Sequence, residues 1–145
     1  MLLFMENIAI DSNVIISFLD TKDAKHAAAV ELSRYVQSHY SGIVIVNIIL
    51  YEVLTILSMK GYKEKAVGFY GEICKDQAVQ FIYSNQAIER VAMEHFYSAE
   101  TKNISFADCI LMASAESFGA DAIASFDSHL KRYSGIVPVI NKAGN

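Results

Sequence analysis

Short runs of apolar, often β-branched residues alternate along the chain with longer segments in which apolar positions recur every three or four residues. The short runs are typical of buried strands, and the longer segments are typical of amphipathic helices. Turn-forming residues separate the two kinds of segment. We therefore expect five strands, over residues 7–10, 43–46, 79–83, 122–125 and 136–139.

The segments between these strands predict the helices. In the second helix Ala28, Leu32, Tyr35 and Val36 would share the inward face, and Gly42 would end it. Asn47 is a plausible N-cap for the third helix. In the segment over residues 86–99 the inward positions would be Ile88, Val91, Ala92, Phe96 and Ala99. The expected helices span residues 12–19, 24–38, 48–59, 63–75, 86–99 and, opened by a capping box at Ser105, residues up to 118.

Strands that alternate with helices predict a mostly parallel central sheet covered by helices on both faces, an α/β fold of three layers (α/β/α) with about five strands. The 145 residues fit one domain over residues 1–145, and no linker or repeat divides them. In such sheets ligands bind beyond the carboxyl ends of the strands, at the point where the strand order reverses. Residues that carry the chemistry are therefore expected at that edge.

Composition indicates the cellular compartment of the protein more clearly than the reaction it catalyses. A formal net charge of −4 argues against a generally basic coat for nucleic acid, although a metal and a local basic rim can replace one. No apolar run is long enough for a membrane span, and residues 1–6 do not have the form of a signal peptide. Cys74 and Cys109 form no paired-ligand spacing. We expect a reduced, cytoplasmic protein without membrane association.

Two acids follow predicted strands. Asp11 comes directly after the apolar run at residues 8–10, and Asp127 follows the run at residues 122–126. Aspartate is common in turns and at helix N-caps, and Asp127 could equally open a short helix over residues 128–133. A buried carboxylate without a partner loses several kcal/mol of hydration, by the order-of-magnitude rule for isolated ions. A shared cation would offset that loss.

Two further acids interrupt predicted helices. Glu52 is the only charged residue over residues 35–59, and Asp108 is the only one over residues 103–115. Asp108 could instead cap its helix reciprocally with Ser105. Each acid lies within the first turn and a half of its helix, so each can point back to the edge where the helix begins. A cluster of oxygen ligands suits Mg²⁺ or Mn²⁺, which can activate water against a phosphate.

The order of these motifs resembles the PIN-domain family, in particular its small VapC-like ribonuclease toxins. The resemblance covers nearly the whole chain and rests on DSNVII at residues 11–16, NIILYE at residues 47–52, SFADCIL at residues 105–111 and SFD at residues 125–127. Two positions depart from the family pattern. His129 replaces an aromatic residue, and Phe126 replaces a small or polar one.

The resemblance implies an endoribonuclease that uses Mg²⁺ or Mn²⁺. Asp11, Glu52, Asp108 and Asp127 would then bind the metal and form the catalytic acids. Ser12 and Ser125 would match the hydroxyl residues of the family's site, or could simply be turn hydroxyls. The resemblance also implies an RNA substrate, a homodimer and a cognate antitoxin.

Two other functions are compatible with parts of the sequence. A haloacid-dehalogenase-type phosphatase also begins with an aspartate after a strand, but needs a second acid two residues later, where this chain has Asn13. A degenerate PIN domain could bind RNA or protein without cutting. Retention of all four acids argues against this second alternative.

Overall fold

The computed structural model describes residues 5–100, 102–133 and 135–143 of the chain. Its centre is a five-stranded sheet in the order β3-β2-β1-β4-β5, in which every neighbouring pair is parallel. This confirms the predicted mostly parallel sheet. The strands are β1 (Met5–Ile10), β2 (Tyr40–Val46), β3 (Val79–Ile82), β4 (Ala122–Ala124) and β5 (Val139–Ile140).

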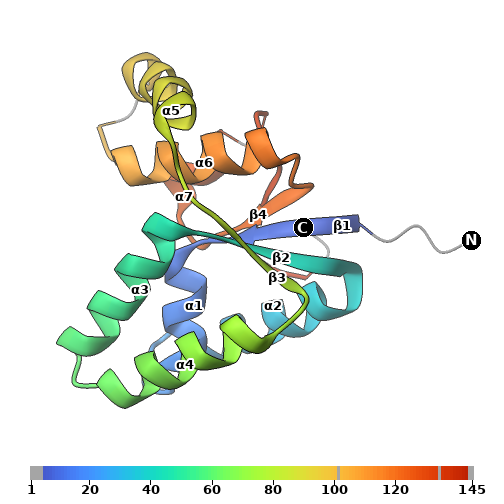
Figure 1. The fold of residues 1–145 in the computed structure, drawn as a ribbon, viewed down its shortest axis with the longest axis vertical. Coiled ribbons are helices and arrows are strands. Elements are labelled where there is room, and N and C mark those ends of the chain that lie inside the picture. Colours follow the sequence, from blue (N-terminus) through green and yellow to red (C-terminus); the bar gives the residue numbers. More distant parts are fainter. Residues whose placement is uncertain (1–4, 101, 134, 144–145) are drawn as a thin grey trace, which may run out of the picture.

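Helices cover both faces of the sheet, as the three-layer fold requires. Figure 1 shows α1 to α4 on one side of the sheet, and α5 and α6 on the other. The helices are α1 (Ser12–Leu19), α2 (His26–His39), α3 (Asn47–Met59), α4 (Lys63–Lys75), α5 (Gln86–Ser98), α6 (Phe106–Phe118) and the short α7 (Ser128–Lys131). None of the helices in the described part of the chain has the length and apolar character needed to cross a membrane.

The strand order reverses next to β1, where the chain leaves the β2–β3 side and returns as β4. Ile10 pairs with Ala124, and the next backbone N–H, that of Asp11, donates to the Ala124 carbonyl over 2.9 Å. Asp11 therefore lies at the point where the strand order of the sheet reverses, which is where parallel α/β folds bind ligands.

Tertiary contacts move several predicted boundaries. β2 begins at Tyr40, so Gly42 lies inside a strand and does not end the preceding helix. On α2 the buried alanine is Ala29, while Ala28 is exposed. β5 starts at Val139, because Pro138 has no N–H for the ladder, although its carbonyl accepts the Ile123 N–H over 2.8 Å.

Two further expectations about helices were wrong. Val46, not Asn47, precedes α3, and the Asn47 side chain instead accepts hydrogen bonds from Ser84 beyond β3. On α5, Val91 and Phe96 are 36% and 44% exposed, so the inward face is narrower than its apolar pattern suggests. Phe96 meets Phe106 edge to face at 5.6 Å between ring centroids.

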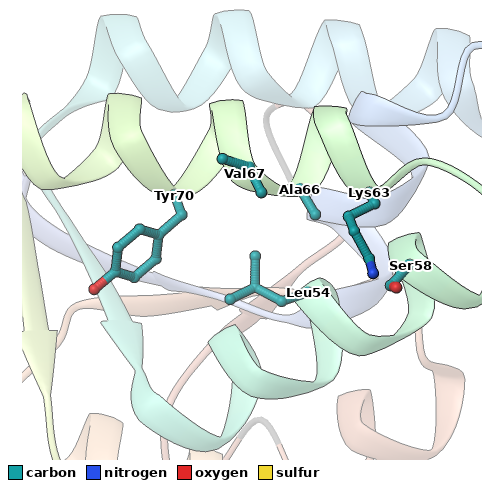
Figure 2. Close-up of a pocket in the computed structure, with 6 residues that line it drawn as sticks. All are labelled: Leu54, Ser58, Lys63, Ala66, Val67 and Tyr70. Atoms are coloured by element: carbon teal, nitrogen blue, oxygen red, sulfur yellow. The ribbon is translucent and has the colours of Figure 1, made fainter.

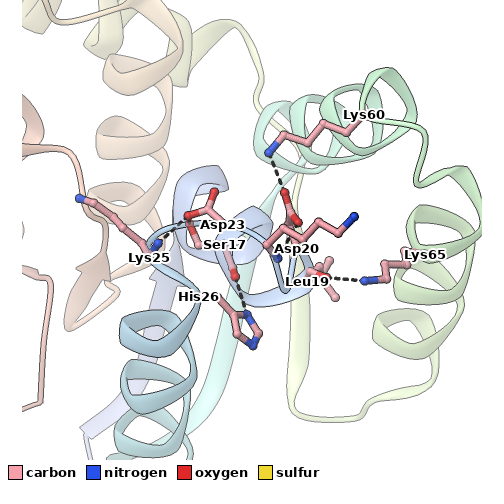
Figure 3. A network of polar contacts seen from close by, with 9 residues as sticks. Ser17, Leu19, Asp20, Asp23, Lys25, His26, Lys60 and Lys65 are labelled. Carbon is pink, nitrogen blue, oxygen red and sulfur yellow. Dashed lines mark hydrogen bonds and ion pairs between the residues drawn. The ribbon is translucent and has the colours of Figure 1, made fainter.

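A polar network holds the α1–α2 connection against α3 and α4 (Figure 3). Asp20, at the end of α1, accepts a hydrogen bond from the Lys60 ammonium at the end of α3 over 2.9 Å. This contact lowers the pKa of Asp20. Lys65 of α4 donates to the Leu19 carbonyl over 3.0 Å. The Lys25 side chain points away from this network.

Candidate active site

Asp11 is the most deeply buried of the four predicted acids, with 3% of its surface exposed. It is the N-cap of α1, and its Oδ1 atom accepts the Ser12 backbone N–H over 2.7 Å. The Ser12 hydroxyl lies farther from the same oxygen, at 3.5 Å. The carboxylate is thus fixed by local backbone geometry at the end of β1.

Ser125, directly after β4, and Asn13, in the first turn of α1, complete the surroundings of Asp11. The Ser125 hydroxyl, which is 1% exposed, donates to Asp11 Oδ2 over 2.6 Å. Asn13 Nδ2 lies 3.3 Å from both Asp11 Oδ2 and Ser125 Oγ, while its Oδ1 accepts the Phe126 N–H over 3.0 Å. Asn13 thus links the ends of β1 and β4. Its position two residues after Asp11 was the one feature of the sequence that pointed to a role in the site.

The electrostatics of Asp11 connect it to two other predicted acids. Burial raises the pKa of Asp11 to about 6, and the hydrogen bonds from Ser125 and Ser12 oppose that rise. Repulsion by the carboxylates of Asp108 and Glu52 raises the pKa further. Acids from two other segments are therefore close enough to disfavour the charged form of Asp11.

Asp108 forms the predicted capping box and also approaches the other acids. Its Oδ2 accepts the Ser105 N–H, and its own N–H donates to Ser105 Oγ, both over 3.0 Å. Burial is the main cause of its raised pKa, and repulsion by Asp127 adds to it, while His129 acts in the opposite direction. Asp108 therefore caps its helix, an alternative that the sequence left open. It also belongs to what we call the acidic edge, the edge of the sheet near which Asp11, Glu52, Asp108 and Asp127 were predicted to lie.

Glu52 and Asp127 are less enclosed than their apolar neighbours in the sequence suggested. Glu52 is exposed, because Ile49, Leu50 and Val53 occupy the buried face of α3. Asp127 is half-buried and caps α7, accepting the His129 N–H over 2.8 Å. Within the described residues, no group of three or more His, Cys, Asp or Glu side chains is arranged to hold a metal ion.

A family model described as the PIN domain matches residues 8–136, which is most of the chain. The chain belongs to the PIN-domain family. This match removes the support for the phosphatase alternative. No curated protein matches the sequence of this PIN domain.

Solved structures of similar fold agree with the family. The *Mycobacterium tuberculosis* toxin VapC20, described as cleaving the sarcin-ricin loop, is 23% identical with a TM-score of 0.76, over 91% of this PIN domain and 98% of that chain. A chain of the *Neisseria gonorrhoeae* FitAcB structure is 17% identical with a TM-score of 0.69, over 92% and 96% of the two chains. A chain of VapBC2 from *Rickettsia felis*, bound to promoter DNA, is 14% identical with a TM-score of 0.67, over 93% and 98%. These likenesses describe the fold.

A basic side chain reaches the acidic edge of this PIN domain from the α1–α2 connection. Lys25 Nζ lies 5.1 Å from the centroid of the Phe126 ring, the residue directly before Asp127. The bulky residue that departs from the family pattern thus supports a lysine by a cation–π contact. Lys25 is exposed, so its ammonium remains available to a ligand at the rim.

Proposed function

We propose that this PIN domain is a Mg²⁺- or Mn²⁺-dependent endoribonuclease and the toxin of a toxin–antitoxin pair. The observation that carries the proposal is the buried Asp11 carboxylate, whose pKa is raised to about 6 at the switch point of the sheet, with Asp108 and Glu52 repelling it. A carboxylate in this position gains stability from a cation, and family membership makes nucleic-acid cleavage the fitting chemistry.

The donor set fits a hard divalent ion. Asp11 and Asp108 would be the first ligands, and Glu52 and Asp127 would complete the acidic edge. All four offer only oxygen donors, which Mg²⁺ and Mn²⁺ prefer, and Mg²⁺ commonly takes only one or two protein carboxylates and keeps several waters. A preformed cage of three side chains is therefore not required for binding.

Neighbouring side chains would hold the Asp11 carboxylate in place and attract the substrate. Ser125, Ser12 and Asn13 hold the Asp11 carboxylate in one orientation through hydrogen bonds to both of its oxygens. Lys25 at the rim would attract an RNA phosphate toward the acids. A divalent ion bound there supplies positive charge that lets water ionise near neutral pH and offsets charge that develops on the phosphate.

We also propose that the protein forms a homodimer and binds a cognate antitoxin. It would act in the cytoplasm, where its RNA substrate would be. One similar structure is described as a toxin–antitoxin complex from *Klebsiella pneumoniae*, at 15% identity. A cleft of about 420 Å³ lies between α3 and α4, and Leu54, Ala66 and Val67 are among the residues that line it (Figure 2). Its apolar walls favour a partner segment with an apolar face. Co-purification with the product of a neighbouring reading frame would test this partner.

The decisive experiment is cleavage of a structured RNA by the purified protein with Mn²⁺, and with EDTA in its place. We expect cutting by the wild type with Mn²⁺ only, and its loss in Asp11→Asn and Asp108→Asn. Glu89→Gln, an exposed acid on α5, is the matched control and should cut normally.

A wild-type protein as inert as the two variants would overturn the nuclease proposal. In that case RNA binding without cleavage would identify the chain as a non-catalytic PIN domain. Asn has the same shape as Asp, so both variants should fold. A thermal melt of each variant would distinguish loss of folding from loss of catalysis.

A further inference from the structure

A small pocket lies beside the acidic edge and takes no part in the site described above. It has a volume of about 280 Å³ and is lined by residues of α3, of α4 and of the end of β3 and the residue after it, among them Asn47, Tyr51, Tyr70 and Tyr83. We call it the tyrosine pocket. Among the residues that the structure describes, none with a charged side chain lines it. It therefore suits an uncharged group better than a phosphate.

The sheet register places this pocket at the same edge as the acids. Val46 pairs with Ile82, so Asn47 and Tyr83 leave β2 and β3 side by side at the carboxyl ends of the strands. Asp11 leaves the neighbouring strand β1 at the same edge, because Ala9 pairs with Val44. Tyr51 directly precedes Glu52 on α3. A chain of nucleotides lying along this edge would meet both places.

The three tyrosines are unusually exposed for large aromatic side chains. Tyr51 is 55% exposed, Tyr70 is 48% exposed and Tyr83 is 67% exposed. All three side chains line the tyrosine pocket. The pKa of Tyr70 is raised, chiefly by interaction with Cys74, and Tyr83 and Tyr51 add to that rise. The three rings thus gather around one opening.

The Asn47 amide is held in a single orientation within the pocket. Its Oδ1 accepts both the Ser84 N–H, over 3.0 Å, and the Ser84 hydroxyl, over 3.1 Å. Among the described residues no acceptor takes the Asn47 Nδ2 hydrogens, so this amide presents donors and no free acceptor. A base edge with a carbonyl oxygen or ring nitrogen provides the matching acceptor.

We propose that the tyrosine pocket binds one unpaired base of the RNA substrate, next to the phosphate that is cleaved. Tyr51 and Tyr83 would contact the faces of the base, and Asn47 Nδ2 would donate to its edge. Aromatic stacking with a fixed amide donor is a common way to recognise splayed-out bases in single-stranded RNA. The inference rests on the proposed ribonuclease function, because it names a subsite for the substrate of that reaction.

The test measures binding of a fluorescein-labelled, single-stranded RNA octamer of mixed sequence in EDTA, where cleavage is absent. We expect Tyr51→Ala and Tyr83→Ala each to weaken affinity by about tenfold, the scale typical of losing one stacked base. Tyr83→Phe keeps the ring and should bind like the wild type. Met59→Ala, an exposed apolar side chain far along α3, is the matched control.

Asn47→Asp tests the amide donor separately. Asp keeps an oxygen for the Ser84 hydrogen bonds but removes the Nδ2 donors, so affinity should fall while the melting temperature stays near that of the wild type. A 4-thiouridine in the octamer should crosslink to Tyr51 or Tyr83, as located by mass spectrometry. Crosslinks found only elsewhere, together with unchanged binding by the variants, would overturn the proposal.

The result is separable from that of the nuclease assay. Wild-type binding that the tyrosine variants weaken, without any cleavage in Mn²⁺, would support the pocket and reject the nuclease. Cleavage and binding that Tyr51→Ala and Tyr83→Ala leave unchanged would reject the pocket alone. A mass by light scattering that falls in Tyr83→Ala, with unchanged RNA affinity, would assign the surface to contacts between copies and overturn the proposal.

Discussion

The hydroxyl of Ser125 donates a hydrogen bond of 2.6 Å to Oδ2 of Asp11, across 114 residues of sequence. The two meet because β1 and β4 pair in parallel, so that their carboxyl ends lie next to each other. A short hydrogen bond to an ionised group is among the stronger polar contacts in proteins. This one fixes the acid from which the proposed chemistry begins.

Replacing Ser125 should be far more harmful to activity than replacing Ser12. Ser125→Ala removes the 2.6 Å hydrogen bond, whereas the Ser12 hydroxyl is 3.5 Å from Asp11 and its backbone N–H survives substitution. We expect Ser125→Ala to lower kcat/KM by about 10- to 100-fold, as is typical for residues that orient a metal ligand. Ser12→Ala should lose a few-fold at most. Equal losses in the two variants would contradict this difference.

Without metal, the stability of the protein should fall as pH rises from about 4 to about 6. The pKa of Asp11 is about 6 in the folded state against 3.8 for the free side chain, so the folded protein binds more protons within that range. Above pH 6 the cost levels off at about 3 kcal/mol, from 1.36 kcal/mol per pKa unit. Asp11→Asn should flatten the decline, as measured by urea unfolding in EDTA. A decline as steep in Asp11→Asn as in the wild type would refute the assignment.

Mn²⁺ should stabilise the wild type and have a smaller effect on Asp108→Asn. A ligand at 100 times its Kd adds about 2.7 kcal/mol to the free energy of unfolding. The amide oxygen introduced at position 108 can still accept the Ser105 N–H, so the capping box should remain. The melting temperature with and without Mn²⁺ measures the effect. An equal rise in both proteins would show that Asp108 does not bind the metal.

Lys25→Met should weaken RNA binding, and Lys22→Met should not. Lys25 is held over Phe126 beside Asp127, while Lys22 is exposed in the same connection and serves as the matched control. Loss of one phosphate contact should reduce the slope of log affinity against log salt by about 0.7 for a single strand. Fluorescence anisotropy at several salt concentrations measures this slope. Identical slopes for the two variants would exclude a phosphate contact by Lys25.

The alternation of strand and helix patterns was enough to predict the fold class and the order of the elements. Strands buried on both faces have a continuous apolar sequence, and β1, β2 and β4 follow that pattern. Boundaries were less accurate, since β2 begins three residues earlier than its apolar run at residues 43–46. Pairing with β1, beginning with Met5 against Tyr40, extends the strand beyond what its own residues favour.

The sequence by itself determined the fold class and predicted which residues would carry the chemistry: four acids at marked positions, and the hydroxyls beside two of them. Only the tertiary structure decided how these residues differ from one another. Asp11 is buried and Glu52 is exposed, although both follow apolar runs, because burial depends on which face of an element meets the sheet. The contacts that join Asp11 to Ser125 and Asn13 to Phe126, and the pocket that joins Asn47 to Tyr83, connect neighbouring strands. Such contacts depend on strand order, which local sequence patterns do not specify.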